Sequence, residues 1–97
     1  MSLQTDPIVE HASLPGGGSV AVWVGVPDDS YIAASDRTTV DLQLREGENV
    51  LATVTTVLEP GQTSEARQLA REVRAAIEAE RLPLTAAALE PFADRLR

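Results

Sequence analysis

Side chains that could carry out catalytic chemistry are few in this sequence. His11 is the only histidine, and there is no cysteine to act as a nucleophile or a metal ligand. The spacing patterns of serine hydrolases, zinc proteases and P-loop nucleotide-binding proteins do not occur. Paired carboxylates stay open as a catalytic device, because their pairing in space is not visible in a sequence. We therefore expect a non-enzymatic protein without catalytic residues.

Acidic and glycine-rich segments offer two further kinds of site. Asp28, Asp29 and Asp36 have the carboxylates that hard cations prefer, but their spacing matches no EF-hand loop. Gly16-Gly17-Gly18 has the composition of a phosphate-binding loop, yet it precedes a predicted strand instead of a helix and no lysine follows it. We expect a turn or a linker at the glycines, and neither a metal nor a cofactor.

An arginine ridge is predicted on the helical second half of the chain. At 100° per residue, its four members lie within about 80° of one another. They are Arg67, Arg71, Arg74 and Arg81. Guanidinium groups bind both phosphates and carboxylates, so the ridge is compatible with a nucleic acid or an acidic protein. Glu78 lies within the same ridge and pairs with it as on an ordinary helix surface, so a solvated surface is the third interpretation.

The only tryptophan, Trp23, lies in a segment where polarity alternates with a period of two. Four valines at positions 20, 22, 24 and 26 share one strand face, and Ala21, Trp23 and Gly25 share the other. Both faces are apolar, which is typical of a strand that is covered on two sides. If a helix covers the valines, Ala21, Trp23 and Gly25 either form an interaction surface or are covered by residues 1–14 or 84–97.

The net charge of −7 is unevenly distributed along the 97 residues. Residues 1–60 contain nine acidic residues and two arginines, whereas residues 61–97 contain six of each. An acidic surface disfavours nonspecific binding to nucleic acid and to anionic membranes. No apolar run approaches the roughly 18 residues that span a bilayer. With no cysteine and no signal-peptide pattern, we expect a cytoplasmic protein.

The strands and helices that must position these residues fall into two regions. Residues 1–18 are predicted to be an N-terminal segment with a short helix over Pro7 to Ala12 and a glycine-rich connection, because Thr5-Asp6-Pro7 is typical of a helix start. Residues 19–97 are predicted to form a single α+β domain, which begins with the strand around Trp23.

Two more strands follow in a hairpin. The segment from Thr38 to Arg45 alternates, with Val40, Leu42 and Leu44 predicted to point inward and its polar residues to point outward on a half-exposed strand. Gly47 is predicted to take a positive φ in the turn, and a strand follows over Val50 to Leu58. Before them, Pro27-Asp28-Asp29-Ser30 is predicted to be a turn and Tyr31 to Ala34 a short strand.

Two helices are predicted after the strands. The first spans about residues 63–81, with Thr63 as its capping residue. One apolar stripe at helical spacing should place this helix on the sheet, and it consists of Ala66, Leu69, Ala70, Val73, Ala76 and Ile77. Thr85 is predicted to cap a shorter helix over Ala86 to Leu96, which Pro91 should interrupt.

The start of the first helix resembles a known family. Gly61-Gln62-Thr63-Ser64-Glu65-Ala66 after a strand is similar to the corresponding segment of HicB-like antitoxin domains. The long hairpin over residues 38–58 departs from the short third strand of that family. The resemblance implies a small regulatory domain that binds nucleic acid or an acidic protein.

The sequence as a whole predicts an α+β fold, in which a three- or four-stranded antiparallel meander is covered on one face by an amphipathic helix. The expected function is a non-enzymatic interaction or oligomerisation module, either a homodimer or a subunit of a small protein complex. Its predicted interaction residues are Trp23, Ala21, Gly25, Arg67, Arg71 and Arg74. Nucleic acid is a disfavoured partner, and no motif identifies a membrane or a small-molecule ligand.

Overall fold

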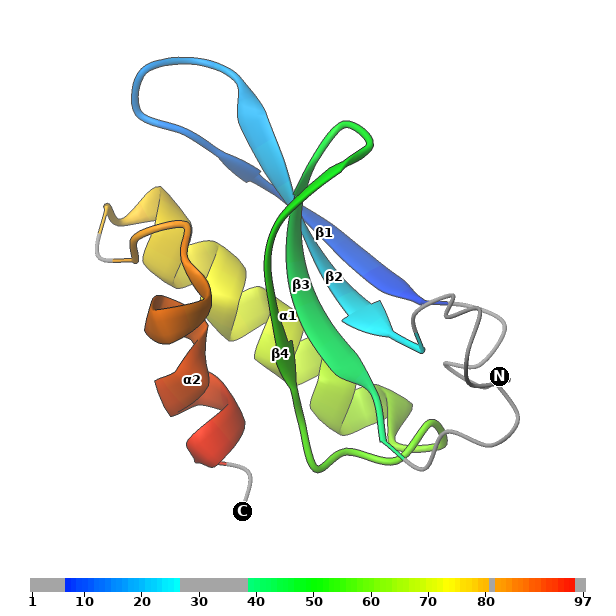
Figure 1. Cartoon of the computed structure of the whole chain (residues 1–97). Helices are drawn as coiled ribbons and strands as arrows, with labels where there is room; N and C mark the ends of the chain where they lie inside the picture. Colours follow the sequence, from blue (N-terminus) through cyan, green and yellow to red (C-terminus); the bar gives the residue numbers. More distant parts are fainter. Residues whose placement is uncertain (1–6, 27–38, 81, 96–97) are drawn as a thin grey trace.

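Four strands form one antiparallel sheet in a computed structural model that describes residues 7–26, 39–80 and 82–95. The strand order is β1-β2-β3-β4, so each strand pairs with its neighbour in sequence (Figure 1). The strands are β1 (Ile8–Ser13), β2 (Ser19–Gly25), β3 (Asp41–Glu46) and β4 (Asn49–Thr55). The helices α1 (Thr63–Glu78) and α2 (Ala86–Asp94) follow. The predicted α+β meander is confirmed with four strands.

The first element is a strand, so the prediction of a short helix over Pro7 to Ala12 is wrong. β1 pairs with β2 along its whole length, from Ile8 opposite Val24 to Ser13 opposite Ser19. The glycine run forms the tight turn between them, in which Gly17 and Gly18 have φ values of 93° and 81°. Asp6-Pro7 imitates a helix start, but pairing with β2 stabilises the segment as a strand, whereas an isolated helix of six residues is too short to be stable.

The pairing register divides the sheet into a helix face and an open face. On β2, Val20, Val22 and Val24 are buried on the helix face, as predicted. Ala21, Trp23 and Gly25 lie on the open face, since successive residues of a strand point to opposite sides. Across the register, Ala21 lies opposite Arg45, and Trp23 lies opposite Gln43.

The β3–β4 hairpin forms the second half of the sheet. Gly47 takes the expected positive φ of 60° in its turn. A register shift at Leu44/Arg45 marks a bulge that leaves Leu51 without a partner on β3. Asp41 and Gln43 point to the open face but are buried, so the prediction of a half-exposed strand is wrong at these two positions. The predicted turn and strand over residues 27–34 lie outside the described residues.

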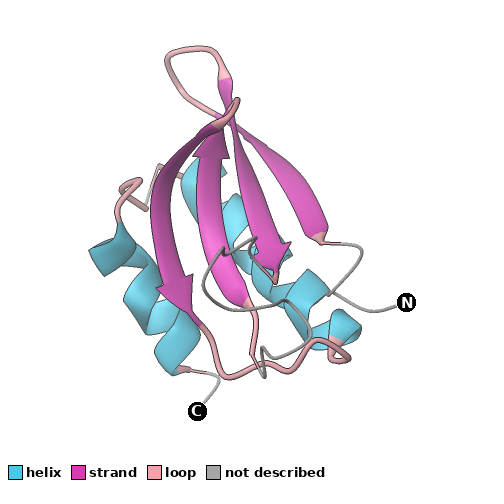
Figure 2. Cartoon of the chain, turned by 45° about the vertical axis from the view of Figure 1, so that its right-hand side comes forward, coloured by secondary structure: helices cyan, strands magenta, loops and turns pink. Residues whose placement is uncertain are grey.

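Both helices cover the same face of the sheet (Figure 2). α1 packs on β1 and β2, and α2 packs on β4, with a smaller contact between the helices. All six residues of the predicted apolar stripe of α1 are buried. Leu89 and Ala93 of α2 complete the same core, which makes this a two-layer structure with one hydrophobic interior.

The two predicted helix caps differ in outcome. Thr85 caps α2 as predicted, because its Oγ1 accepts a hydrogen bond of 3.2 Å from the Ala88 N–H, and Pro91 lies inside that helix. Thr63 is the first residue of α1 and does not cap it; Gln62 occupies the cap position without a side-chain bond to the helix. The Gln62 side chain instead accepts from the Glu59 N–H at 2.8 Å, which fixes the turn before the helix.

Candidate interaction surfaces

Trp23 is buried within one copy of the chain, with 8% of its surface exposed. The Arg45 guanidinium lies 4.2 Å above the indole ring, within the range of a cation–π contact. The Arg45 Nε donates a 2.7 Å hydrogen bond to Oε1 of the neighbouring Gln43. Gln43, Arg45 and Trp23 are therefore linked to one another on the open face. The apolar centre of that face is therefore occupied by residues of the same chain.

Gly25 completes this arrangement. A methyl group placed on its Cα would lie 2.8 Å from Pro7 Cβ and 3.1 Å from the Trp23 ring. Both distances are shorter than ordinary van der Waals contacts, so only glycine fits between the proline and the indole. Of the predicted interaction residues on this face, Ala21 is half-buried, and Trp23 and Gly25 are buried. Their role in binding a partner remains a prediction.

The arginine ridge faces the edge of the sheet at β1. Arg71 Nε lies 3.6 Å from one Glu10 carboxylate oxygen, and Arg74 Nη1 lies 3.9 Å from the other. Arg74 also pairs with Glu78 on its own helix, with 3.5 Å between Nε and Oε1. Arg67 is exposed and forms no ion pair with any other described residue. Arg81 lies outside the described residues.

The edge at β1 is sheltered by α1. Leu14 N–H donates to Gly18 O across the turn, so the alternation of an antiparallel ladder directs the backbone groups of Val9, His11 and Ser13 away from β2. The outward N–H of Ser13 donates to Glu78 Oε2 at 3.1 Å. Together with the Arg71 and Arg74 pairs to Glu10, this contact places charged side chains along the strand. Natural proteins protect edge strands in this way.

Within the described part of the chain, the opposite edge at β4 lacks that protection. Thr56 N–H donates to Val40 O, so the same alternation directs the backbone groups of Thr53 and Thr55 away from β3. No other described residue bonds to them. The ten residues from Asn49 to Leu58 contain no charged side chain and no proline. Charged side chains and prolines are two devices that keep an edge strand from pairing with another chain.

Exposed apolar side chains gather on the same edge. Among the described residues, four large hydrophobic side chains are exposed, and three of them lie on β4 or just after it. They are Val50, Leu51 and Val57, which are 50%, 40% and 39% exposed. The fourth, Val9, lies on β1. The β4 edge thus combines backbone groups that no other described residue bonds with exposed apolar side chains, which are the two features needed to add a strand.

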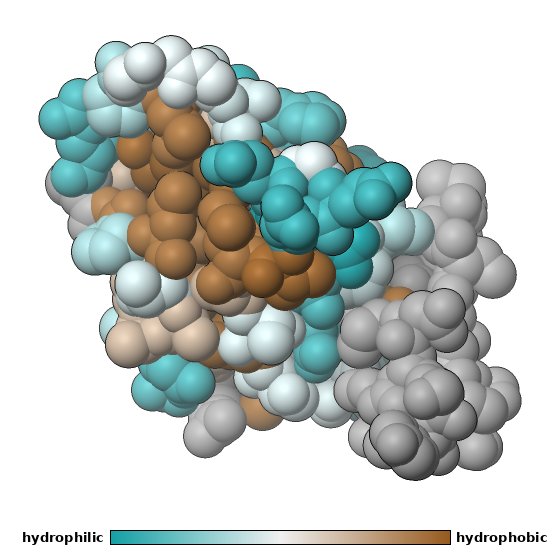
Figure 3. Space-filling view, turned by 45° about the horizontal axis from the view of Figure 1, so that its top comes forward, coloured by the Kyte–Doolittle hydropathy of each residue, from teal (hydrophilic) through white to brown (hydrophobic). Residues whose placement is uncertain are grey.

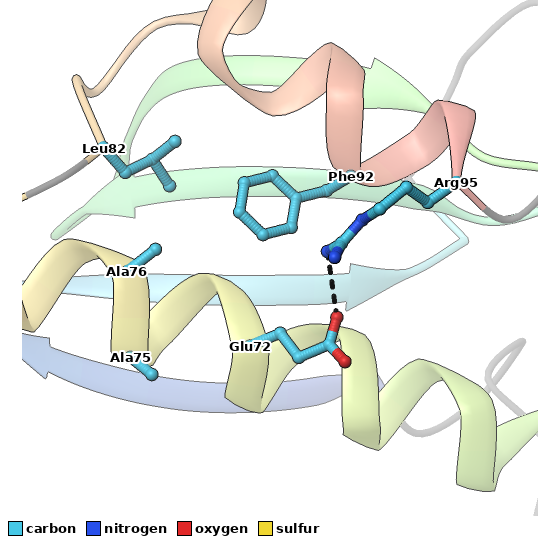
Figure 4. Close-up of a pocket in the computed structure, with 6 residues that line it drawn as sticks. All are labelled: Glu72, Ala75, Ala76, Leu82, Phe92 and Arg95. Atoms are coloured by element: carbon cyan, nitrogen blue, oxygen red, sulfur yellow. Dashed lines mark hydrogen bonds and ion pairs between the residues drawn. The ribbon is translucent and has the colours of Figure 1, made fainter.

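A groove of about 520 Å³ separates the two helices. Ala75 and Ala76 of α1, Phe92 of α2 and Leu82 from the connection line it (Figure 4). The small side chains of α1 leave the groove open, because they present little volume toward α2. Arg95 closes one end, with its guanidinium 3.0 Å from a Glu72 carboxylate oxygen and over the Phe92 ring.

A second hollow of about 460 Å³ lies at the C-terminal end of α1. Leu14, Ile77, Leu82 and Leu84 give it an apolar lining, and Glu80 lies at its rim. Figure 3 views the molecule from this end and shows hydrophobic side chains gathered there. Leu82 lines both hollows, so they adjoin at this side chain.

The remaining candidate residues do not come together. His11 is exposed on β1, and Asp28, Asp29 and Asp36 lie outside the described residues. Within the described part of the chain, no group of three or more histidines and acidic residues is arranged to hold a metal ion. None of the described helices is long and apolar enough to cross a membrane.

Comparisons with protein-family models, with curated proteins and with solved structures found no match to this chain. The similarity of residues 61–66 to HicB-like domains therefore stands on those six residues. Within the structure these residues belong to the turn before α1 and to its first turn. Arg71 and Arg74, which lie further along the same helix, contact Glu10.

Sequence reasoning identified the β4 segment as a strand but not as the exposed edge. β4 ends the sheet with or without β1, and what the missed β1 hairpin changes is the opposite edge, where β1 takes the place of β2. The one signal available was the absence of charge between Glu48 and Glu59 in a chain with a net charge of −7. An uncharged stretch in an acidic chain indicates a surface from which charged side chains are excluded. The position of β4 at the edge of the sheet shows that this surface is a strand edge.

Proposed function

We propose that this protein is a small non-enzymatic protein-interaction module that binds its partner by strand addition to β4. The observation that carries the proposal is the difference between the two edges of the sheet. β1 carries Glu10 and is bonded by Glu78, whereas β4 presents the backbone groups of Thr53 and Thr55 on a strand that has no charged residue of its own between Glu48 and Glu59. A partner strand would bond to these groups and cover the apolar side chains around them.

Proline substitution at the outward position of each edge tests this proposal. Thr53→Pro removes an N–H that points away from β3, so it blocks strand addition while leaving the β3–β4 ladder in place. His11→Pro is the matched control on β1. We expect Thr53→Pro to abolish self-association or the capture of a specific partner from host lysate, and His11→Pro to retain it. Equal binding by wild type and Thr53→Pro would overturn the proposal.

The alternative function is a regulatory domain that binds nucleic acid or an acidic protein through the arginine ridge. Arg67 supports it, since its guanidinium is exposed and unpaired among the described residues. Arg71 and Arg74 support it less, because any acidic ligand must compete with Glu10 and Glu78 for them. For both proposed functions, the cytoplasmic location and the absence of catalysis are predictions.

A further inference from the structure

We infer that the strand added to β4 is β4 of a second copy of this chain. The inference rests on the proposed function and names its partner. Two copies would join their sheets in an antiparallel manner around a twofold axis, which gives one continuous sheet of eight strands. Such an isologous contact requires a surface that is complementary to itself.

The charge pattern favours a second copy as the occupant. In a twofold pairing, any charged residue near the axis faces the same charge on the other copy, which is unfavourable. The chain has a net charge of −7, so two copies repel each other unless their contact excludes acidic side chains. The segment from Asn49 to Leu58 is free of charge, whereas Glu48 and Glu59 lie directly on either side of it. The uncharged stretch therefore coincides with the edge strand.

The side chains of the strand also match one another. A twofold axis at Val54 would place Thr53 opposite Thr55 of the second copy, and both residues direct their backbone groups outward. The same register would place Leu51 opposite Val57 of the second copy. Exposed apolar residues would then cover each other at both ends of the paired strands, with threonine pairs in the middle.

The other edge limits the assembly to two copies. β1 has its Ser13 N–H bonded to Glu78, and Glu10 is held by Arg71 and Arg74. A third copy would have to break these contacts and place its uncharged strand against a charged one. The assembly is therefore closed, as in most soluble homo-oligomers.

Cysteine cross-linking tests the inference cleanly, because the natural sequence has no cysteine. Differently tagged Thr53→Cys and Thr55→Cys chains would be mixed and oxidised, with His11→Cys on β1 as the control. We expect the mixed disulfide dimer to form in preference to either self-product, and His11→Cys to remain monomeric under the same conditions. A cross-linked His11→Cys dimer with unlinked β4 variants would overturn the inference.

Lysine substitution provides the second arm of this experiment. Thr53→Lys places a charge on the edge, and the dimer dissociation constant should rise about tenfold or more, while Trp23 fluorescence shows that the fold is retained. Thr55→Lys replaces it if Thr53→Lys does not fold. A monomeric wild type that binds another protein in a Thr53→Pro-sensitive manner would overturn the homodimer and leave the proposed function standing. A monomer without any such binding would overturn both.

Discussion

At the scale of single residues, the open face of the sheet is organised around Trp23. Arg45 covers the ring, Gln43 bonds to Arg45, and Gly25 leaves room for Pro7. A sequence shows that Trp23 lies opposite the valines, but it does not show what lies above the ring. Pro7 and Arg45 are far from Trp23 along the chain, and the missed β1 strand is what brings Pro7 close.

Gly25→Ala should destabilise the protein by about 1–3 kcal/mol, because the added methyl group clashes with the Pro7 ring and the Trp23 indole. Urea unfolding followed by circular dichroism measures the change. Gly16→Ala is the control, since a methyl group there meets no atom within 4 Å. Equal stabilities of the two variants would show that Pro7 does not pack on Gly25.

Arg45→Ala should expose the indole to water and shift Trp23 fluorescence to longer wavelength. The loss of the cation–π contact and of the bond to Gln43 should lower stability by about 1 kcal/mol. Arg67→Ala, which removes an arginine that forms no ion pair with the other described residues, should leave the spectrum unchanged. An unshifted spectrum for Arg45→Ala would mean that other residues cover the ring.

At the scale of secondary structure elements, periodicity predicted more than capping chemistry did. The stripe from Ala66 to Ile77 was correct in every residue, since burial of an apolar face determines where a helix lies. Two sequence signals for a helix start gave wrong predictions. Asp6-Pro7 precedes a strand that pairs with β2, and Thr63 follows a turn that the hydrogen bond between Glu59 and Gln62 fixes.

The two threonines give a matched prediction for capping. Thr85→Ala should destabilise the protein by about 1 kcal/mol, because it removes the acceptor for the Ala88 N–H. Thr63→Ala should have little effect, since Thr63 makes no capping bond. Thermal unfolding of both variants measures the difference. A larger effect of Thr63→Ala would contradict the assigned helix start.

Glu80 gives a prediction of opposite sign at the end of α1. It has a φ of 60°, a conformation that glycine adopts without strain, and its N–H bonds to Ile77 O. Glu80→Gly should therefore stabilise the protein by about 1 kcal/mol. Ala79→Gly should destabilise it, because Ala79 has a negative φ of −85°. Differential scanning calorimetry of the pair would test this, and a lower melting temperature for Glu80→Gly would contradict it.

At the scale of the whole molecule, the charge distribution separates the two proposed functions. A dimer brings together two chains of net charge −7 and places Glu48 of one copy near Glu59 of the other, so added salt should strengthen it. Binding of an acidic ligand through the arginine ridge should weaken with salt instead. The dissociation constant of the dimer at several salt concentrations gives the sign directly. Weaker dimerisation at high salt would contradict the uncharged edge as the contact.

The fold class could be predicted from the sequence because it depends on the spacing of apolar residues. The interaction surface depends on the order of the strands in the sheet. The alternation in residues 19–58 and the stripe of α1 both reflect burial against a single core. β4 is an edge strand in either case, but the identity of the opposite edge depends on the hairpin formed by Ile8–Ser13. That strand is hard to recognise in the sequence because Glu10 places a charge on its helix face. The sequence predicts an interaction surface at Trp23 because both faces of its strand are apolar, and in the structure the ring is buried within one chain.

Sedimentation equilibrium of the full chain tests the central claim most directly. The wild type should approach twice the 10.3 kDa chain mass as its concentration rises, and Thr53→Lys should remain a monomer over the same range. His11→Lys, at the outward position of the sheltered edge, should dimerise like the wild type. A wild type that stays monomeric at high concentration, or a dimer that His11→Lys disrupts and Thr53→Lys does not, would contradict self-association through β4.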